Sequence, residues 1–393
     1  MKKSFWCHGV SGFLTFQVLF GLQVLGSPLV EVLKTPNDGI QPRAAVDDEG
    51  RLHLIYFSGD PMGGDVFYIN RDEGESEFGS PLRVNSRAGS AVAVGTIRGA
   101  QMAVGRNGRI HVAWMGSGKV AVKDGKGGHP KAPMVYTRLD DSGKLFEPER
   151  NLLTWTSGLD GGGSVAADRQ GNVYVAWHGR GPKSAEGEFG RAVFVTHSSD
   201  DGQTFEVERQ ANPKPTGACS CCGLRAFVDR GNQLRLLYRM AEGRNRDMAL
   251  LTSSDSGQTF EVKRINQWQI EACPMSSASM TDSDGGLLVA TERISKIEVL
   301  KMDSVLEGKR ELSFIPRGMR DGKHPSLAAN EQGDQIIVWA KGAGWKKGGT
   351  LKWQVYDRQG QLTSESRTER VGIPAWSFAS TVTRSDGRFV VIY

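Results

Sequence analysis

The octapeptide Ser198-Ser199-Asp200-Asp201-Gly202-Gln203-Thr204-Phe205 returns, with one residue changed, as Ser253-Ser254-Asp255-Ser256-Gly257-Gln258-Thr259-Phe260. The two copies stand about one supersecondary unit apart, and each follows an apolar run. Such an internal repeat predicts a repeat architecture. In each copy the Asp carboxylate is placed to accept hydrogen bonds from backbone N–H groups, and the Gly tolerates a positive φ. The motif therefore predicts a tight hairpin turn whose Asp is structural rather than catalytic.

The rest of the chain repeats the same organisation with weaker sequence identity. Its 393 residues include 50 glycines, helix-period patterns are scarce, and short alternating runs are bounded by Gly, Asp and Asn. In each unit an apolar strand leads through a polar turn to a second strand, which mostly ends in an aromatic residue. Seven such hairpins occur, at residues 44–56, 102–114, 164–177, 224–238, 276–290, 326–339 and 379–393.

This repeat predicts an all-β fold, a β-propeller built of four-stranded blades. The hairpin count favours seven blades, and six stays open because two hairpins could share one blade. Residues 28–33 resemble the outer strands of other units. We therefore expect this N-terminal strand to pair with the C-terminal hairpin and close the ring, which removes exposed sheet edges.

The N-terminus has the features of a secretory signal. A pair of lysines precedes an apolar stretch over residues 13–25, and Gly26 offers a small residue for cleavage. We predict a signal peptide over residues 1–26, a secreted or periplasmic location, and a single propeller domain over residues 27–393. The apolar stretch is short and interrupted by glutamines, which argues against a stable membrane anchor.

The charge pattern bears on the class of partner. The net charge is +5, and the Lys and Arg residues are interspersed with acids. This spread argues against a nucleic-acid surface, and no P-loop, dinucleotide fingerprint or H-E-x-x-H motif occurs. A mildly basic cleft suits an acidic sugar, so the expected partner is a glycan or glycoconjugate. The sequence makes no prediction of the oligomeric state.

The cysteines form the most specific feature outside the octapeptides. Cys219-Ser220-Cys221-Cys222 stands directly before the inner strand of the fourth unit, and Cys273-Pro274 directly before that of the fifth. Because these places are equivalent in the repeat, we expect the sulfurs to converge near the axis. Three interpretations stay open. They are disulfides, a metal site that binds Zn or Cu through Cys219, Cys221, Cys222 and Cys273 with His324 as a further ligand, and free or redox-active thiols.

The repeats and the middle of the chain resemble the sialidase (neuraminidase) superfamily. The octapeptides are similar to its Asp-box, or BNR, repeat. The C-x-C-C motif, the Arg246-Asp247 pair and the stretch Trp268-Gln269-Ile270-Glu271-Ala272-Cys273-Pro274 resemble an exported bacterial sialidase-like subgroup. The similarity covers essentially the whole mature chain. It implies a hydrolase, an exo-glycosidase that releases a terminal acidic sugar.

The resemblance implies three chemical roles at one face of the propeller. Arginines bind the substrate carboxylate, a Tyr activated by a Glu is the nucleophile, and an Asp is the acid/base. The family's first arginine stands in Arg-Ile-Pro, whereas this chain has Gln41-Pro42-Arg43, with the arginine on the other side of the proline. The candidates for these roles in this chain are Arg43, Arg180, Arg239, Arg246, Arg293 and Trp177 for substrate binding, and Tyr238, Glu271, Glu292 and Asp60 for catalysis.

Several candidates also have a structural interpretation. Tyr238 ends a strand and is expected to pack as Trp339 does, Arg246 suits a solvated loop, and Asp60 suits a turn. The sequence supports three functions. The first is an exported sialidase-like glycan-active protein. The second is a non-catalytic propeller whose cysteine-rich metal or disulfide centre binds a glycan or protein partner. The third is a plain protein-interaction scaffold.

Overall fold

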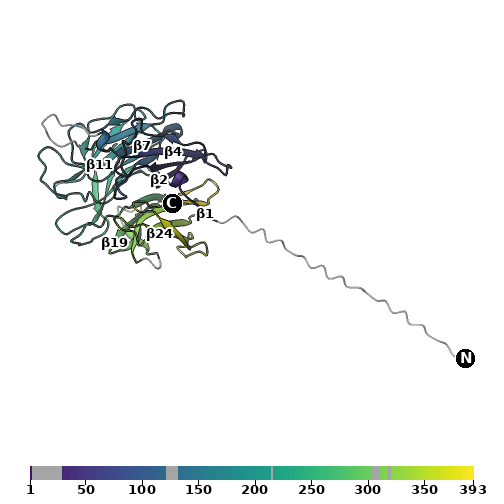
Figure 1. Ribbon diagram of the computed structural model, residues 1–393. Helices are drawn as coiled ribbons and strands as arrows, with labels where there is room; N and C mark the ends of the chain where they lie inside the picture. The colour runs from purple at the N-terminus through teal and green to yellow at the C-terminus, as the bar shows by residue number, and fades with distance from the viewer. Residues whose placement is uncertain (2–28, 121–131, 214–215, 303–309, 317–319) are drawn as a thin grey trace.

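The computed structural model describes residue 1 and residues 29–120, 132–213, 216–302, 310–316 and 320–393. Seven sheets lie around a common axis, so the chain is an all-β propeller as predicted, and it has seven blades (Figure 1). Six sheets have four strands, and the seventh has three in the order β1-β27-β26. The predicted signal peptide falls on residues that, Met1 apart, lie outside the described part of the chain.

Each blade contributes one inner strand, a second strand and outer strands. The inner strands of blades one to seven are β2 (Ile40–Val46), β6 (Gln101–Val104), β10 (Gly163–Ala167), β14 (Arg225–Val228), β18 (Ser279–Ser283), β22 (Gly322–Ala329) and β26 (Ser380–Thr383). The second strands are β3 (Leu52–Ser58), β7 (Ile110–Met115), β11 (Val173–Gly179), β15 (Leu234–Arg239), β19 (Gly286–Arg293), β23 (Gln335–Lys341) and β27 (Phe389–Ile392).

The third and fourth strands form the outer part of blades one to six. They are β4 (Asp65–Arg71) and β5 (Leu82–Arg83), β8 (Met134–Arg138) and β9 (Arg150–Asn151), β12 (Ala192–Ser198) and β13 (Arg209–Gln210), β16 (Met248–Ser253) and β17 (Glu261–Arg264), β20 (Lys296–Met302) and β21 (Arg310–Phe314), and β24 (Gly349–Tyr356) and β25 (Arg367–Ile373). The described residues include three short 3-10 helices, η1 (Pro36–Asp38), η2 (Arg106–Gly108) and η3 (Gly118–Val120). No helix in the described ranges is long and apolar enough to cross a membrane.

The two ends of the chain close the ring. Strand β1 (Val30–Leu33) pairs in parallel with β27, with Val30 opposite Phe389, and the C-terminus lies beside β1 in Figure 1. The Thr35 N–H also donates to the Tyr393 carbonyl at 2.7 Å. The predicted pairing of the N-terminal strand with the C-terminal hairpin is therefore confirmed, and it covers an edge that would otherwise invite aggregation.

The hydrophobic core lies between neighbouring blades. The second strands are nearly continuous apolar runs because both of their faces are covered. Trp114, Trp177 and Trp339 stand near the ends of these strands and are at most 2% exposed. Tyr174 of blade three and Tyr238 of blade four belong to one such interblade cluster. The aromatic strand ends that the sequence shows are thus packing residues.

Serine side chains join the inner strands of successive blades. At one position of the inner strand, Ser164 Oγ accepts from Ala226 N–H of the next blade at 2.9 Å. Ser380 Oγ does the same for Ala44 N–H at 3.1 Å, across the point of ring closure. Ser279 and Ser326 make equivalent bonds to the blades that follow them. This position is therefore a structural contact in four of the seven blades.

The two octapeptides form the same turn, on the opposite face from the inner-strand entrances. Gly202 N–H donates to Ser198 Oγ at 2.8 Å, and the Thr204 N–H and hydroxyl donate to Asp200 at 2.8 and 2.6 Å. The second copy repeats these bonds. Although partial burial opposes the change, hydrogen bonds from Thr204 and Ser198 lower the pKa of Asp200 to about 2. The Asp carboxylates are thus committed to their own turns.

Candidate functional site

Three blades depart from the serine that joins the inner strands. The equivalent residues there are Arg43 in blade one, Gln101 in blade two and Arg225 in blade four. The strand register shows the equivalence, because Arg43 pairs with Ile55, Gln101 with Ala113 and Arg225 with Leu237, each one residue before a buried aromatic side chain. Large polar side chains therefore replace the structural serine in these blades and extend toward the axis.

Arg43 carries a positive charge without an internal counter-ion. Its guanidinium carbon lies 4.0 Å from the centre of the Phe378 ring. Its Nε is buried without a hydrogen-bond partner, and Arg43 forms no ion pair among the described residues. Burial, together with the nearby charge of Arg225, holds the pKa of Arg43 well below its usual range. Yet Arg43 is only half-buried.

Arg225 approaches Arg43 from the fourth blade and is held by neutral groups. Its Nη1 donates to Gln101 Oε1 at 3.0 Å and its Nε to the Ala278 carbonyl at 2.9 Å. Burial lowers the pKa of Arg225 to about 10. Gln101 and Arg225 thus make contact although blade three separates their blades in the ring. We call Arg43, Gln101 and Arg225 the axial triad.

Backbone bulges shape the entrances beside the axial triad. In β2 the register shifts between Ile40 and Arg43, and Gln41 has a φ of 56°. In β22 the shift falls between Lys323 and Ser326, and His324 has a φ of 55°. Both are X-Pro sites, where proline withholds its backbone donor. His324 is buried with its Nδ1 3.2 Å from Ser277 Oγ, and burial lowers its pKa to about 3.

The four cysteines converge beside this region, as the sequence predicts. Cys219 Sγ lies 3.2 Å from Cys221 Sγ and 3.6 Å from Cys222 Sγ. Cys273 comes from the entrance to blade five and contacts the same group, and all four are free cysteines. Sharing of the Cys219 proton with Cys221 raises the pKa of Cys219, whereas the bond from Cys219 lowers that of Cys273. We call these residues the thiol cluster.

Several polar groups surround the thiol cluster. Glu188 offers a carboxylate oxygen within 4.8 Å of the Cys221 and Cys273 sulfurs. Ser220 Oγ donates to Asp160 at 2.9 Å, and Arg98 pairs with the other oxygen of Asp160 at 2.7 Å. His178 is fully buried with no partner on either ring nitrogen, and burial lowers its pKa to about 4. The cluster therefore sits among polar groups of blades two to four.

Tyr238, the predicted nucleophile, and Trp177, a predicted substrate-binding residue, lie in the core. Tyr238 is 0% exposed, and its hydroxyl lies 3.3 Å from Thr216 Oγ1, while burial raises its pKa. Trp177 is likewise 0% exposed, and its indole N–H donates to Thr156 Oγ1 at 3.2 Å. Neither ring presents an open face to a sugar. This placement matches the packing interpretation of the strand-end aromatics.

The other predicted arginines already have partners within the protein. Arg239 lies 4.9 Å from the Trp268 ring and donates to the carbonyls of Arg246 and Glu292. Arg246 pairs with Glu188 at 2.8 Å. Arg180 donates to the Gly187 carbonyl at 3.0 Å, and Arg293 pairs with Glu298 at 2.8 Å. Of the predicted arginines, only Arg43 lies in the axial triad, and the sequence analysis did not single out Arg225 or Gln101.

The predicted carboxylates lie apart from one another. Asp60 accepts the Met62 N–H at 2.9 Å in an exposed turn, and Glu271 pairs with Arg244 at 3.1 Å on the surface. Glu292 differs, since it is 2% exposed and lies 3.1 Å from the Lys323 ammonium. Burial raises the pKa of Glu292, although Lys323 opposes the shift. It is the one predicted carboxylate with an acid-like environment.

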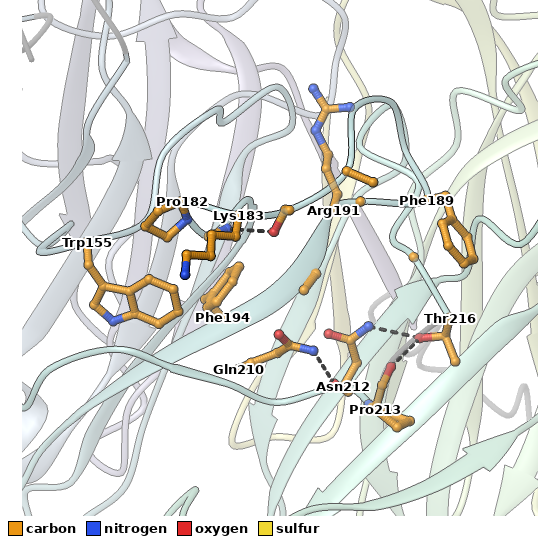
Figure 2. Close-up of a pocket in the computed structure, with 16 residues that line it drawn as sticks. Trp155, Pro182, Lys183, Phe189, Arg191, Phe194, Gln210, Asn212, Pro213 and Thr216 are labelled. Carbon is orange, nitrogen blue, oxygen red and sulfur yellow. Dashed lines mark hydrogen bonds between the residues drawn. The ribbon is translucent and has the colours of Figure 1, made fainter. Parts of the chain in front are cut away.

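A separate pocket of about 480 Å³ lies on the outer part of blade three. Figure 2 shows Trp155, Pro182 and Phe194 on one side of it and Phe189, Pro213 and Thr216 on the other. Arg191 lines the pocket with its stem, and its guanidinium points away, with one nitrogen 3.6 Å from Asp160 (Figure 2). The axial triad does not line this pocket. It offers an aromatic surface apart from the axial triad.

Comparison with known proteins shows the fold class. No family model and no curated protein matches the sequence. Among solved structures, the Hadza microbial sialidase has a TM-score of 0.50 at 15% identity, covering 77% of this chain and 63% of its own. The leech intramolecular trans-sialidase has 0.53 at 10%, covering 81% and 68%. The Fusarium graminearum α-L-arabinofuranosidase has 0.55 at 10%, covering 84% and 97%.

These likenesses show that the chain has the β-propeller fold found in sialidases and other glycosidases. The chain spans less than two thirds of the length of the microbial sialidase that it matches. Function belongs to the site rather than to the fold.

Proposed function

We propose that this chain is an exported glycan-active propeller that recognises a terminal acidic sugar, of the sialic acid type, at its axial triad. One observation carries the proposal. The inner-strand position that holds a structural serine in four blades holds Arg43, Gln101 and Arg225 in the other three. The proposed substrate class rests on the resemblance to sialidases, and the proposed location of the site rests on these three residues.

The chemistry of the axial triad suits a carboxylate. A guanidinium presents a planar set of N–H donors that matches the two oxygens of a carboxylate. Arg43 has unused donors, and Arg225 places a second positive charge beside it. Two uncompensated charges in one enclosed region are costly for the free protein. A bound anion removes that cost and satisfies the donors, so an acidic ligand is favoured over a neutral one.

For the hydrolytic form of this function we assign the proton donor to Glu292. A general acid needs a pKa near the working pH, and burial moves Glu292 in that direction. Lys323, which pairs with Glu292, directly precedes His324 at the entrance to blade six. The burial of Tyr238 favours a second candidate, a non-catalytic glycan-binding propeller.

Binding of sialyllactose to the purified mature chain, measured by calorimetry, tests the proposal. Lactose is the neutral control, and a glucuronide distinguishes the sialic acid type from other acidic sugars. We expect sialyllactose to bind and lactose not to bind. Because hydrogen bonds to charged groups contribute about 1.5–3 kcal/mol, R43Q and R225Q should each weaken binding about tenfold or more.

The matched control is R169Q, which removes an exposed arginine that pairs with Asp48 on the opposite face. It should bind like the wild type. Equal binding of lactose and sialyllactose, or wild-type affinity in R43Q and R225Q, would contradict the proposal. Release of free sialic acid in the same samples separates the hydrolytic form from the binding form.

A further inference from the structure

The thiol cluster joins loops from two neighbouring blades. Cys219, Cys221 and Cys222 lie in one tight turn before β14, in which the Cys222 N–H donates to the Cys219 carbonyl at 3.2 Å. Cys273 belongs to the entrance of blade five, and the Gly223 N–H fixes the two segments together through the Ser276 carbonyl at 2.8 Å. The backbone therefore holds the sulfurs close before any ligand arrives.

The spacing of the sulfurs fits a tetrahedral ion. Cys219 Sγ lies 3.2 Å from Cys221 Sγ and 3.6 Å from Cys222 Sγ, whereas a disulfide needs about 2.05 Å. Four thiolates at about 2.3 Å from a zinc ion stand about 3.8 Å apart. The sulfurs of Cys219, Cys221 and Cys222 lie within 4.8 Å of one another, and Cys273 Sγ lies within 4.8 Å of Cys221 Sγ. Moreover, Cys221 and Cys222 are adjacent in the chain, so a disulfide between these two would leave that turn strained.

Charges around the cluster match a negatively charged metal–thiolate group. The Arg239 guanidinium lies near Cys222, and the Arg191 guanidinium lies near Cys219. Four thiolates around a divalent ion carry a net charge of about −2, which two arginines offset. Glu188 accepts the Arg246 guanidinium at 2.8 Å and so remains an outer neighbour of the sulfurs.

We propose that Cys219, Cys221, Cys222 and Cys273 bind one thiophilic metal ion, Zn²⁺ or Cu⁺, in a closed four-thiolate site. Binding displaces the thiol protons to solvent and involves no change of oxidation state. A site whose positions are all filled by protein is structural rather than catalytic. The ion ties the entrances of blades four and five together beside the axial triad, and so keeps Arg225 and Arg239 in place.

Metal content of the full mature chain tests the inference. The protein is loaded with Zn²⁺ or, under argon, with Cu⁺ as its acetonitrile complex, and then dialysed and measured by elemental mass spectrometry. We expect about one ion per chain, and the element retained under competition identifies the ion. Substitution with Co²⁺ should give the intense visible absorption of a tetrahedral thiolate site.

Two variants and one control keep the test decisive. C222S removes a buried sulfur, and C273S removes an exposed one. Each should lower retained metal at least tenfold, whereas S220A, in the same turn but without a sulfur, should retain it. Intact mass spectrometry showing disulfides among these cysteines overturns the proposal. So do four freely reacting thiols in protein that has been offered both ions.

Discussion

Arg43 and Arg225 occupy the same position of the inner strand in blades one and four, each followed by an alanine whose N–H is bonded by a serine of the preceding blade. The two guanidiniums are close enough for the charge of Arg225 to help lower the pKa of Arg43. The backbone conformation therefore repeats around the ring, whereas the side chain at this inner-strand position differs between blades. What distinguishes this propeller is the set of residues that break the repeat.

The charge of Arg43 should destabilise the free protein. In R43M a side chain of similar length keeps the contact with Phe378 and removes an unpaired charge. Replacing buried charges by apolar groups is often stabilising by about 1–4 kcal/mol. We expect R43M to raise the free energy of unfolding by about 1 kcal/mol, measured by urea denaturation, while it abolishes sialyllactose binding.

The matched control for R43M is R71M. Arg71 is also buried but makes two hydrogen bonds to Glu31, at 2.9 and 3.0 Å. Its removal should lower stability because Glu31 loses its partner. If R43M destabilised the protein as much as R71M does, Arg43 would be a structural residue and the binding role would lose its physical basis.

The sequence predicted the fold well because the repeat is local. Each hairpin has its own alternation of apolar and polar residues and its own turn residues. The number of blades and the closure of the ring therefore follow from counting the hairpins. The contact between Cys219 and Cys273 was predicted for the same reason, because residues at equivalent positions of adjacent blades are neighbours in the ring. Tyr238 and Arg239 were harder to assign, because burial depends on how adjacent blades pack and a single sequence does not show it.

Arg225 shows what a finer comparison of the repeats detects. The dipeptide Arg-Ala occurs at residues 43–44 and 225–226, at matching points of two units. Aligning the units residue by residue would have marked both arginines as departures from serine. The contact between Arg225 and Gln101 could not be predicted, since it spans blade three and joins residues 124 positions apart in the chain.

The two octapeptides provide a matched pair of glycine substitutions. Gly202 and Gly257 have φ values of 78° and 79°, so alanine is strained equally at both. A Cβ at Gly202 would lie 1.9 Å from the Tyr136 hydroxyl, whereas at Gly257 the nearest atom, in Leu234, is 3.5 Å away. We expect G257A to cost about 1–2 kcal/mol of unfolding free energy, from backbone strain alone.

G202A should cost more, by about 1–3 kcal/mol, because Tyr136 is fully buried and moving it overpacks the core. Thermal unfolding of both variants, with the wild type alongside, measures the difference. Equal losses in the two variants would mean that the Tyr136 contact relaxes freely and that strain alone sets the effect.

Burial of His111 should make stability depend on pH. Its Nδ1 lies 2.7 Å from the Tyr136 hydroxyl and its Nε2 3.5 Å from Asp201. Burial lowers the pKa of His111, with Arg109 and Arg138 adding to the shift and Asp201 opposing it. On acidification, His111 is therefore protonated at a higher pH in the unfolded chain than in the folded protein. The free energy of unfolding then falls as the pH drops below about 6.5 toward the pKa of His111 in the folded state.

Each buried histidine of this kind should add a slope of up to about 1.4 kcal/mol per pH unit in that window. We expect H111Q to be less stable at neutral pH and to show a shallower decline on acidification, measured by urea unfolding between about pH 7 and about pH 5. An unchanged slope in H111Q would show that His111 is protonated in the folded state.

Glu292 and Glu271 make a second matched pair, this time for catalysis. Both stand on the predicted face, but Glu292 is 2% exposed beside Lys323, and Glu271 is exposed beside Arg244. Loss of a general acid typically costs about 10²–10⁴-fold in rate. If the chain hydrolyses sialosides, E292Q should lower kcat at least about 100-fold, and E271Q should leave it near the wild-type value.

The pH profile separates a proton donor from a structural role for Glu292. Since burial raises the pKa of Glu292, the carboxyl keeps its proton to a higher pH than an ordinary glutamate, and activity should fall as the pH rises through that value. E292Q should lack this alkaline limb while sialyllactose still binds through Arg43 and Arg225. A residual activity in E292Q that retains the same limb would move the acid role to another group. Loss of binding together with rate would instead place Glu292 among the groups that hold the axial face together.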